Sequence, residues 1–247
     1  MKPILQHALP EGQAELAGAR LPAMRSIPVE DWLHVDDAYP EQLAEKARLM
    51  ALRPRDVVAV LPSAEAAVAE LSEMIEAAVL ARPEFGAVAG GIRCPDGRVV
   101  AEAGKHGFAR VAQLVQEDIC ILQTMNGEAV LTAALLCFPA GWTLAEKIGH
   151  PMRRIHSPVP PYDTGVAVRV QRMFDHLPVG RVLLRANLLR YDDPTLYQPH
   201  SEAAPRPVGH PGSPYLRSER QTLRRLPRSG AIAFTIHTSV VRRDQQA

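Results

Sequence analysis

The chain has 247 residues, of which 47% are hydrophobic and 22% charged, a composition typical of a globular protein with one large or two small domains. Its formal net charge of +1 gives no global field that would indicate nucleic acid or a membrane surface as a partner. The charge is uneven, with 12 basic and 18 acidic residues in 1–120 but 16 and 9 in 121–247. The basic half is suited to an anionic ligand, to an acidic protein partner, or to pairing with the acidic half.

Three cysteines, Cys94, Cys120 and Cys137, show no CxxC spacing. This spacing of the cysteines disfavours a disulfide framework and a tetrahedral zinc site and favours a reducing compartment. The first residues lack the apolar core of a signal peptide, and no window holds about 18 uninterrupted apolar residues. We therefore expect a cytoplasmic protein without a membrane span. Fingerprints of nucleotide, zinc-hydrolase and serine-hydrolase sites (GxGxxG, GxxxxGK[ST], HExxH, GxSxG) do not occur.

The first half of the chain predicts mainly helices. The first 35 residues are punctuated by prolines and predict an irregular arm wrapped around the body. Residues 87–101 predict a hairpin with Cys94-Pro95-Asp96-Gly97 as its turn. Apolar residues at helical spacing predict three helices, over 41–52, 64–81 and 108–118.

The second half predicts mainly strands. Short apolar runs indicate strands over 129–137 and 181–190, and a helix is expected between them over 164–177. Leu216–Leu226 and Ala231–Val241 flank a turn that contains Gly230, which predicts a long antiparallel hairpin. Helices toward the front and strands toward the back indicate an α+β fold built on an antiparallel sheet.

One segment combines a rigid backbone with reactive side chains. It comprises three runs, Cys137-Phe138-Pro139-Ala140-Gly141-Trp142, Lys147-Ile148-Gly149 and Ile155-His156-Ser157-Pro158-Val159-Pro160. Ordered loops on a rigid scaffold are where functional sites usually lie, which favours His156 as a functional residue. The alternative is a proline-rich connection in which His156 only caps a turn.

Residues 217–228 form a basic strand. Its period of two sends Arg220 and Arg224 to one face and Arg217, Glu219 and Arg225 to the other. Binding of single-stranded nucleic acid would require aromatic residues between the arginines, and there are none. We therefore do not expect nucleic acid as a partner.

The rigid segment and three further motifs resemble the haem-dependent oxidative N-demethylase family. The further motifs are Arg185-Ala186-Asn187-Leu188-Leu189, Glu219-Arg220-Gln221-Thr222-Leu223-Arg224-Arg225-Leu226-Pro227 and Phe234-Thr235-Ile236-His237-Thr238. The likeness covers most of residues 30–240. It implies a PAS-like α+β fold, an antiparallel sheet flanked by helices. In that fold an N-terminal arm (1–35) precedes a single haem-binding domain (36–241) and a tail (242–247).

The resemblance also implies an activity. A family member holds one haem b, whose iron activates O₂ with electrons from a separate reductase or ferredoxin-type protein. A small secondary amine such as dimethylamine then loses a methyl group as formaldehyde. The resemblance leaves a homo-oligomer open. The family is expected to carry an aromatic residue after Arg-x-Asn, but this chain has Leu188. We therefore expect the core near the site to be packed differently from that of the family.

Haem iron needs an axial protein ligand, usually His, Cys, Met or Tyr. Among the nine histidines, His156 is the first choice because prolines clamp it, and His237, in a predicted strand, is the second. A third alternative is that neither residue binds the iron. Cys137 offers a thiolate in principle, although a cysteine in an apolar strand is more often an inert core residue. Haem propionates require basic partners, and the candidates are Arg153, Arg154, Arg185 and Arg220.

A protonated amine in an apolar pocket needs a carboxylate partner. Glu219, the one acid of the basic strand, is the candidate catalytic residue, because it could also accept the proton of the amine. The alternative is a cross-strand ion pair of Glu219 with Arg217 or Arg225. Glu117 and Asp118 are interpreted as structural acids at a helix end.

Two further functions compete with the enzyme. One is a PAS-like haem or small-ligand sensor without turnover, against which the lack of an output helix pair counts. The other is a family member that has lost its haem and remains as a binding subunit.

Overall fold

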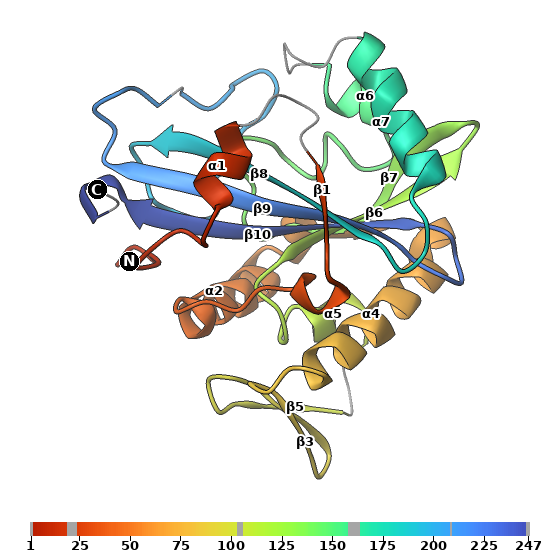
Figure 1. Ribbon diagram of the computed structural model, residues 1–247, viewed down its shortest axis with the longest axis horizontal. Helices are drawn as coiled ribbons and strands as arrows, with labels where there is room; N and C mark the ends of the chain where they lie inside the picture. The colour runs from red at the N-terminus through yellow and green to blue at the C-terminus, as the bar shows by residue number, and fades with distance from the viewer. Residues whose placement is uncertain (1, 19–23, 103–105, 158–163, 208, 246–247) are drawn as a thin grey trace.

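The computed structural model describes residues 2–18, 24–102, 106–157, 164–207 and 209–245. Its centre is a seven-stranded sheet in the order β1-β8-β9-β10-β6-β7-β2, in which every neighbouring pair is antiparallel (Figure 1). The strands are β1 (Arg25–Ile27), β2 (Val58–Val60), β6 (Asp118–Met125), β7 (Glu128–Leu135), β8 (Val182–Tyr191), β9 (Tyr215–Arg225) and β10 (Ile232–Arg242). The predicted antiparallel sheet with flanking helices and an N-terminal segment is confirmed.

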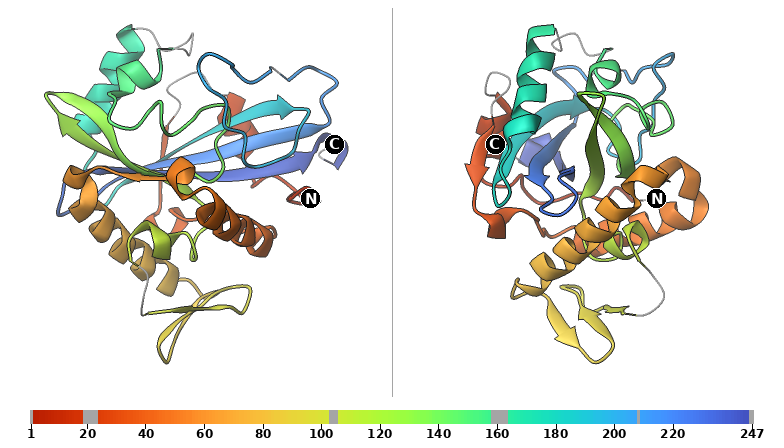
Figure 2. Two further views of the ribbon diagram at one scale, coloured as in Figure 1. Left: turned by 180° about the vertical axis from the view of Figure 1, so that it is seen from behind. Right: turned by 90° about the vertical axis from the view of Figure 1, so that its right-hand side faces the viewer.

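Helices cover both faces of this sheet. In Figures 1 and 2, α2, α4 and α5 lie on one side of it, and α6 and α7 lie on the other. A second sheet of three short strands projects beyond α4. The helices are α1 (Gln13–Gly18), α2 (Tyr39–Leu52), α3 (Pro54–Val57), α4 (Glu65–Leu80), α5 (Phe108–Val111), α6 (Met152–Ile155) and α7 (Thr164–His176). The short strands are β3 (Gly86–Val88), β4 (Gly91–Arg93) and β5 (Val99–Ala101), and 3-10 turns lie at Val29–Asp31, Pro62–Ala64 and Arg243–Gln245.

Alternation along the strands gives the seven-stranded sheet two separate hydrophobic cores. Ile119 of β6 packs in a cluster that includes Leu71 of α4, whereas its neighbour Cys120 packs in a cluster that includes Phe174 of α7. The sheet therefore separates two environments, which we call the α4 face and the α7 face.

No helix among the described residues is both long and apolar enough to cross a membrane.

The predicted hairpin of β9 and β10 is present, with residues paired from Tyr215–Arg242 to Arg225–Ile232. The predicted alternation of its arginines also holds. Arg220 donates to the carbonyl oxygens of Asp31 and Trp32 on the α4 face, whereas Arg225 donates to the carbonyl oxygen of Leu177 on the α7 face. Guanidinium groups therefore donate to backbone carbonyls on both faces, because successive side chains of a strand point to opposite faces.

The prediction of a helix over 108–118 is wrong beyond its first turn. α5 ends at Val111, and β6 begins at Asp118. The Asp118 carboxylate is fully buried, accepts the backbone N–H groups of Cys137 and Phe138, and lies 3.7 Å from Lys46 Nζ. These tertiary contacts outweigh helix propensity, which is a weak local preference.

The N-terminal arm is more regular than predicted. It contains α1, and its strand β1 pairs with β8 at the edge of the seven-stranded sheet. The predicted turn at residues 94–97 is confirmed, since it joins β4 and β5. The tail over 242–247 begins on the last residue of β10 and continues as a 3-10 turn.

Candidate functional site

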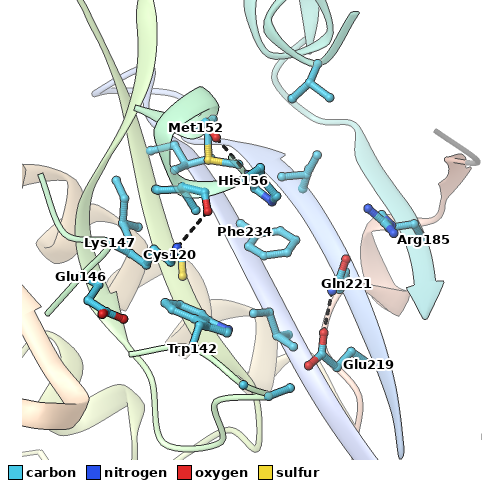
Figure 3. A pocket seen from close by; sticks show the side chains of 18 of the residues that line it. Cys120, Trp142, Glu146, Lys147, Met152, His156, Arg185, Glu219, Gln221 and Phe234 are labelled. Carbon is cyan, nitrogen blue, oxygen red and sulfur yellow. Dashed lines mark hydrogen bonds between the residues drawn. The ribbon is translucent and has the colours of Figure 1, made fainter. Parts of the chain in front are cut away.

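A cavity of about 540 Å³ lies on the α7 face of the sheet, within the size range of small-molecule and cofactor sites. Residues of β6, β8, β9 and β10 form its floor, and residues of α6, α7 and the loop at Trp142 form its walls. Its apolar lining includes Met152, Met173, Leu223 and Phe234. Figure 3 shows Phe234 between the side chain of His156 and the pair of Glu219 and Gln221.

The local chain geometry aims His156 at this cavity. His156 follows the single turn of α6, and its Nδ1 lies 3.0 Å from the carbonyl oxygen of Met152. Pro151, at the start of α6, forms a bridge with Val130 of β7, and Gly149 takes a φ of +77°, which glycine adopts without a Cβ clash. The edge of the sheet therefore positions the turn that carries the imidazole.

The imidazole of His156 is neutral near pH 7. Burial lowers its pKa, the charges of Lys147 and Arg185 lower it further, and the contact with the Met152 carbonyl opposes them. A carbonyl next to Nδ1 assigns the proton to that atom, so the lone pair is on Nε2. A neutral imidazole with this tautomer is the form that binds a metal.

Ionic contacts at the rim fasten the segment that leads to His156. Lys147 Nζ donates to the carbonyl oxygen of Ile155 at 2.9 Å and to Glu202 at 2.6 Å. Arg154 forms a bidentate pair with Glu202 at 2.9 and 3.0 Å. Hydrogen bonds from Arg154 and Lys147 lower the pKa of Glu202 to about 2. The loop that contains Glu202 is thus tied to the end of α6.

Glu219 lies on the floor of the cavity and is held by neutral amides. Its Oε2 accepts hydrogen bonds from Asn187 Nδ2 at 2.8 Å and from Gln221 Nε2 at 2.7 Å. Asn187 Oδ1 accepts the backbone N–H of Glu219 at 2.9 Å. The described contacts of Glu219 include no ion pair with Arg217 or Arg225. Both guanidinium groups donate to backbone carbonyls instead.

Arg185 of β8 also lines the cavity. Its Nε is buried and has no hydrogen-bond partner among the described residues. Burial lowers the pKa of this guanidinium, and the charge of Glu219 acts in the opposite direction. A partly buried guanidinium with an open donor suits a carboxylate of a ligand.

The other predicted site residues lie elsewhere. His237 is fully buried on the α4 face, and its Nε2 lies 2.9 Å from Asp36. Arg220 is on the same face, beneath Trp32. Arg154 stands at the rim with its side chain 45% exposed and engaged by Glu202. The structure therefore brings His156, Glu219 and Arg185 to the cavity, but not His237, Arg154 or Arg220.

Of the two buried cysteines near the middle of the sheet, Cys120 lies at the cavity and Cys137 in the core of the α4 face. Burial raises the pKa of the Cys137 and Cys120 thiols, and the charge of Asp118 raises both further. Cys120 lines the cavity as a neutral thiol. Leu188 does not line the cavity, because it points to the face of β8 opposite to Asn187.

Sequence reasoning missed Asn187 and Gln221. Both belong to motifs recognised in the sequence, but their proximity depends on the register that pairs Asn187 with Glu219 across β8 and β9. The position of Gln221 could have been predicted, because residues two apart on a strand share a face and Gln221 lies two residues after Glu219. Nothing local to residues 185–189 indicated the pairing partner.

The cavity suits a haem on three observations. Its lining is mostly apolar, which suits the macrocycle. His156 offers a neutral imidazole for an axial position. The unpaired Nε of Arg185 would find its partner in a propionate.

The fold and the cavity define an α+β protein with a cofactor-sized apolar pocket that holds an imidazole, an arginine and a carboxylate. A sequence model of the family described as haem-dependent oxidative N-demethylase, alpha subunit-like, matches residues 23–246. The chain belongs to this family. The family name implies dependence on haem, an oxidoreductase class and an enzyme with more than one subunit.

Proposed function

We propose that this protein is the haem b subunit of a monooxygenase that removes a methyl group from a small secondary amine such as dimethylamine. The observation that carries the proposal is the presence of His156, Arg185 and Glu219 in one apolar cavity. Bound haem supplies O₂ activation and oxidation of the N-methyl carbon. Dimethylamine, O₂, two electrons and two protons give methylamine, formaldehyde and water.

The residues of the chain have separate roles in this proposal. His156 would hold the iron through Nε2, and Arg185 would bind a propionate. Among the predicted propionate partners, Arg154 supports the segment of His156 from the rim, and Arg220 supports the opposite face of the sheet. The fold around the haem is the PAS-like domain that the resemblance implies.

Glu219 binds the ammonium form of the substrate and takes its proton. The nitrogen must lose that proton before its lone pair can assist oxidation of the methyl group. Asn187 and Gln221 donate to one carboxylate oxygen of Glu219 and so fix its orientation without neutralising its charge. An unpaired ammonium ion in an apolar cavity is costly, which makes the carboxylate a selective element for amines.

Electrons must arrive from outside the chain, because its sequence contains no flavin or iron–sulfur motif. We propose a separate reductase or ferredoxin-type protein as their source, a cytoplasmic location, and no nucleic-acid or membrane partner. A homo-oligomer is compatible with this arrangement.

The ligand assignment predicts that His156→Ala abolishes or displaces the Soret band of protein reconstituted with hemin. His176→Ala is the matched control, because His176 Nδ1 contacts the carbonyl oxygen of Arg172 in the same way but the side chain lies outside the cavity. Added imidazole should restore the band of His156→Ala. An unchanged spectrum in His156→Ala would reject the assignment, and wild-type protein that stays colourless with hemin would reject the proposed function.

The role of Glu219 predicts that Glu219→Gln retains the Soret band but binds dimethylamine about 10-fold to 100-fold more weakly, as expected for loss of a charge-assisted hydrogen bond. Amine titration followed by the spectral shift measures this change. Imidazole binding to the iron is the control and should not change. An amine response equal to that of the wild type removes Glu219 from the site. Formaldehyde release with a chemical reductant and O₂ then separates an enzyme from a sensor.

A further inference from the structure

On the α4 face, two imidazoles and a carboxylate converge away from the haem cavity. His34, Asp36 and His237 each offer one ligand atom, and these three atoms lie within 4.8 Å of one another. His237 comes from the centre of β10, whereas His34 and Asp36 precede α2. We call this group the His34–Asp36–His237 cluster.

The contacts within the cluster are short. His237 Nε2 lies 2.9 Å from Asp36 Oδ2, so a proton is shared between an imidazole and a carboxylate there. The rings of His34 and His237 meet edge to face with centroids 4.8 Å apart. His237 is fully buried, and Asp36 has a side chain that is 11% exposed. A metal ion could replace the shared proton without moving the strands.

Further groups orient the three side chains. Asp36 accepts a hydrogen bond from Gln116 Nε2 at 2.7 Å and from Gln6 Nε2 at 2.9 Å. Glu117 accepts the backbone N–H of His34 at 2.7 Å, and its Oε1 lies 3.8 Å from His237 Nδ1. A metal-binding imidazole commonly has a carboxylate near its second ring nitrogen, which orients the ring.

Two polar atoms of this group have no hydrogen-bond partner among the described residues. They are Nδ1 of His237 and Oε2 of Glu117, and both side chains are at most 1% exposed. Buried polar atoms without partners are rare in native proteins and mark a place where a further group belongs. A metal ion on Nε2 of His237 would fix the proton of that ring on Nδ1, which lies 3.8 Å from Oε1 of Glu117.

We propose that the His34–Asp36–His237 cluster binds one divalent transition-metal ion of the zinc class through two imidazole nitrogens and one carboxylate oxygen. Two nitrogen ligands and one oxygen ligand suit such ions, and three protein ligands leave one coordination position for water. Asp36 and Glu117 together balance the charge of the ion. The guanidinium groups of Arg82 and Arg220, which donate to backbone carbonyls of residues 31–33, lie nearby and oppose it.

The ion would fasten the segment before α2 to the centre of the sheet. Because the cluster lies on the face opposite to the haem cavity, this inference does not depend on the proposed function. Titration of haem-free protein with Co²⁺ and Zn²⁺ tests the cluster separately, because no haem iron is then present.

The full chain, dialysed against a chelator and then against buffer, is titrated with Co²⁺. One equivalent should bind with d–d absorption typical of nitrogen and oxygen ligands, and Zn²⁺ should displace it. His34→Ala should weaken Co²⁺ binding about 100-fold or more, and Glu117→Gln about 10-fold, in line with the loss of a ligand and of its support. His176→Ala should bind like the wild type.

Absence of a stoichiometric Co²⁺ spectrum in the wild type would overturn the proposal, and so would equal affinity in His34→Ala. Near-ultraviolet circular dichroism verifies that each variant is folded. If His34→Ala does not fold, Asp36→Asn provides the same comparison, because the amide oxygen can still accept the hydrogen bond from Gln116 but is a far weaker ligand than a carboxylate. Wild-type affinity in folded Asp36→Asn also overturns the proposal.

Discussion

His156 and His176 make the same local contact, from ring Nδ1 to the carbonyl oxygen four residues earlier. Their surroundings separate them. His156 lines the cavity and its pKa is lowered by burial, whereas His176 ends α7 in solvent. His237 has a third environment, fully buried beside Asp36. At the scale of the residue, the side chain's partners and access to water decide what an imidazole can do.

Arg217 shows the same principle for a cation. Its side chain is almost fully buried, and it donates to the carbonyl oxygens of Phe138 at 2.7 Å, Leu196 at 3.0 Å and Thr195 at 3.3 Å. Burial lowers the pKa of its guanidinium, while the charge of Glu219 raises it. Arg217 therefore joins two loops to β9 through groups that the interior would otherwise leave unsatisfied.

We predict that Arg217→Met lowers the free energy of unfolding by about 2–4 kcal/mol, because it leaves buried carbonyls without donors. Denaturant unfolding followed by circular dichroism measures the change. Arg153→Met is the control, with a side chain 74% exposed, and should change the free energy by less than about 0.5 kcal/mol. Equal stability of the two variants would show that Arg217 is not structural.

At the scale of the element, α4 holds the turn of the long hairpin. Glu70 of α4 is 2% exposed and accepts the backbone N–H groups of Arg228 at 2.6 Å and Ser229 at 2.8 Å. Burial acts to raise the pKa of this carboxyl, but hydrogen bonds from Ser229 and Arg228 outweigh it and leave the pKa lowered. The Glu70 carboxylate thus serves as the acceptor for backbone N–H groups of the turn, a role that a side chain within the turn often has.

A lowered pKa in the folded state means that the Glu70 carboxylate stabilises the fold above its ordinary pKa of about 4.3 and loses this effect as the pH falls through the folded value. We predict that Glu70→Gln lowers the free energy of unfolding by about 1–3 kcal/mol at pH 7. The difference from the wild type should shrink below about pH 4. Urea unfolding at both pH values tests this prediction, and a difference independent of pH would contradict it.

At the scale of the whole molecule, β10 links the two sites because neighbouring residues point to opposite faces. Phe234 and Ile236 line the cavity on the α7 face, whereas His237 belongs to the metal cluster proposed on the other face. β10 lies between β9 and β6 and has a neighbour along each edge. Hydrogen bonds to two neighbouring strands therefore hold the strand that presents both sets of side chains.

Sequence pattern alone predicts the family, the long hairpin, the helices near 41–52, 64–81 and 164–177, and the two faces of the basic strand. These features depend on local period and on motifs that are contiguous in the chain. Three features follow from packing instead: Asn187 and Gln221 hold Glu219, His237 faces Asp36, and the helix predicted to 118 ends at Val111. Strand register and burial depend on partners distant in sequence, and their contacts outweigh the weak preference of any single residue.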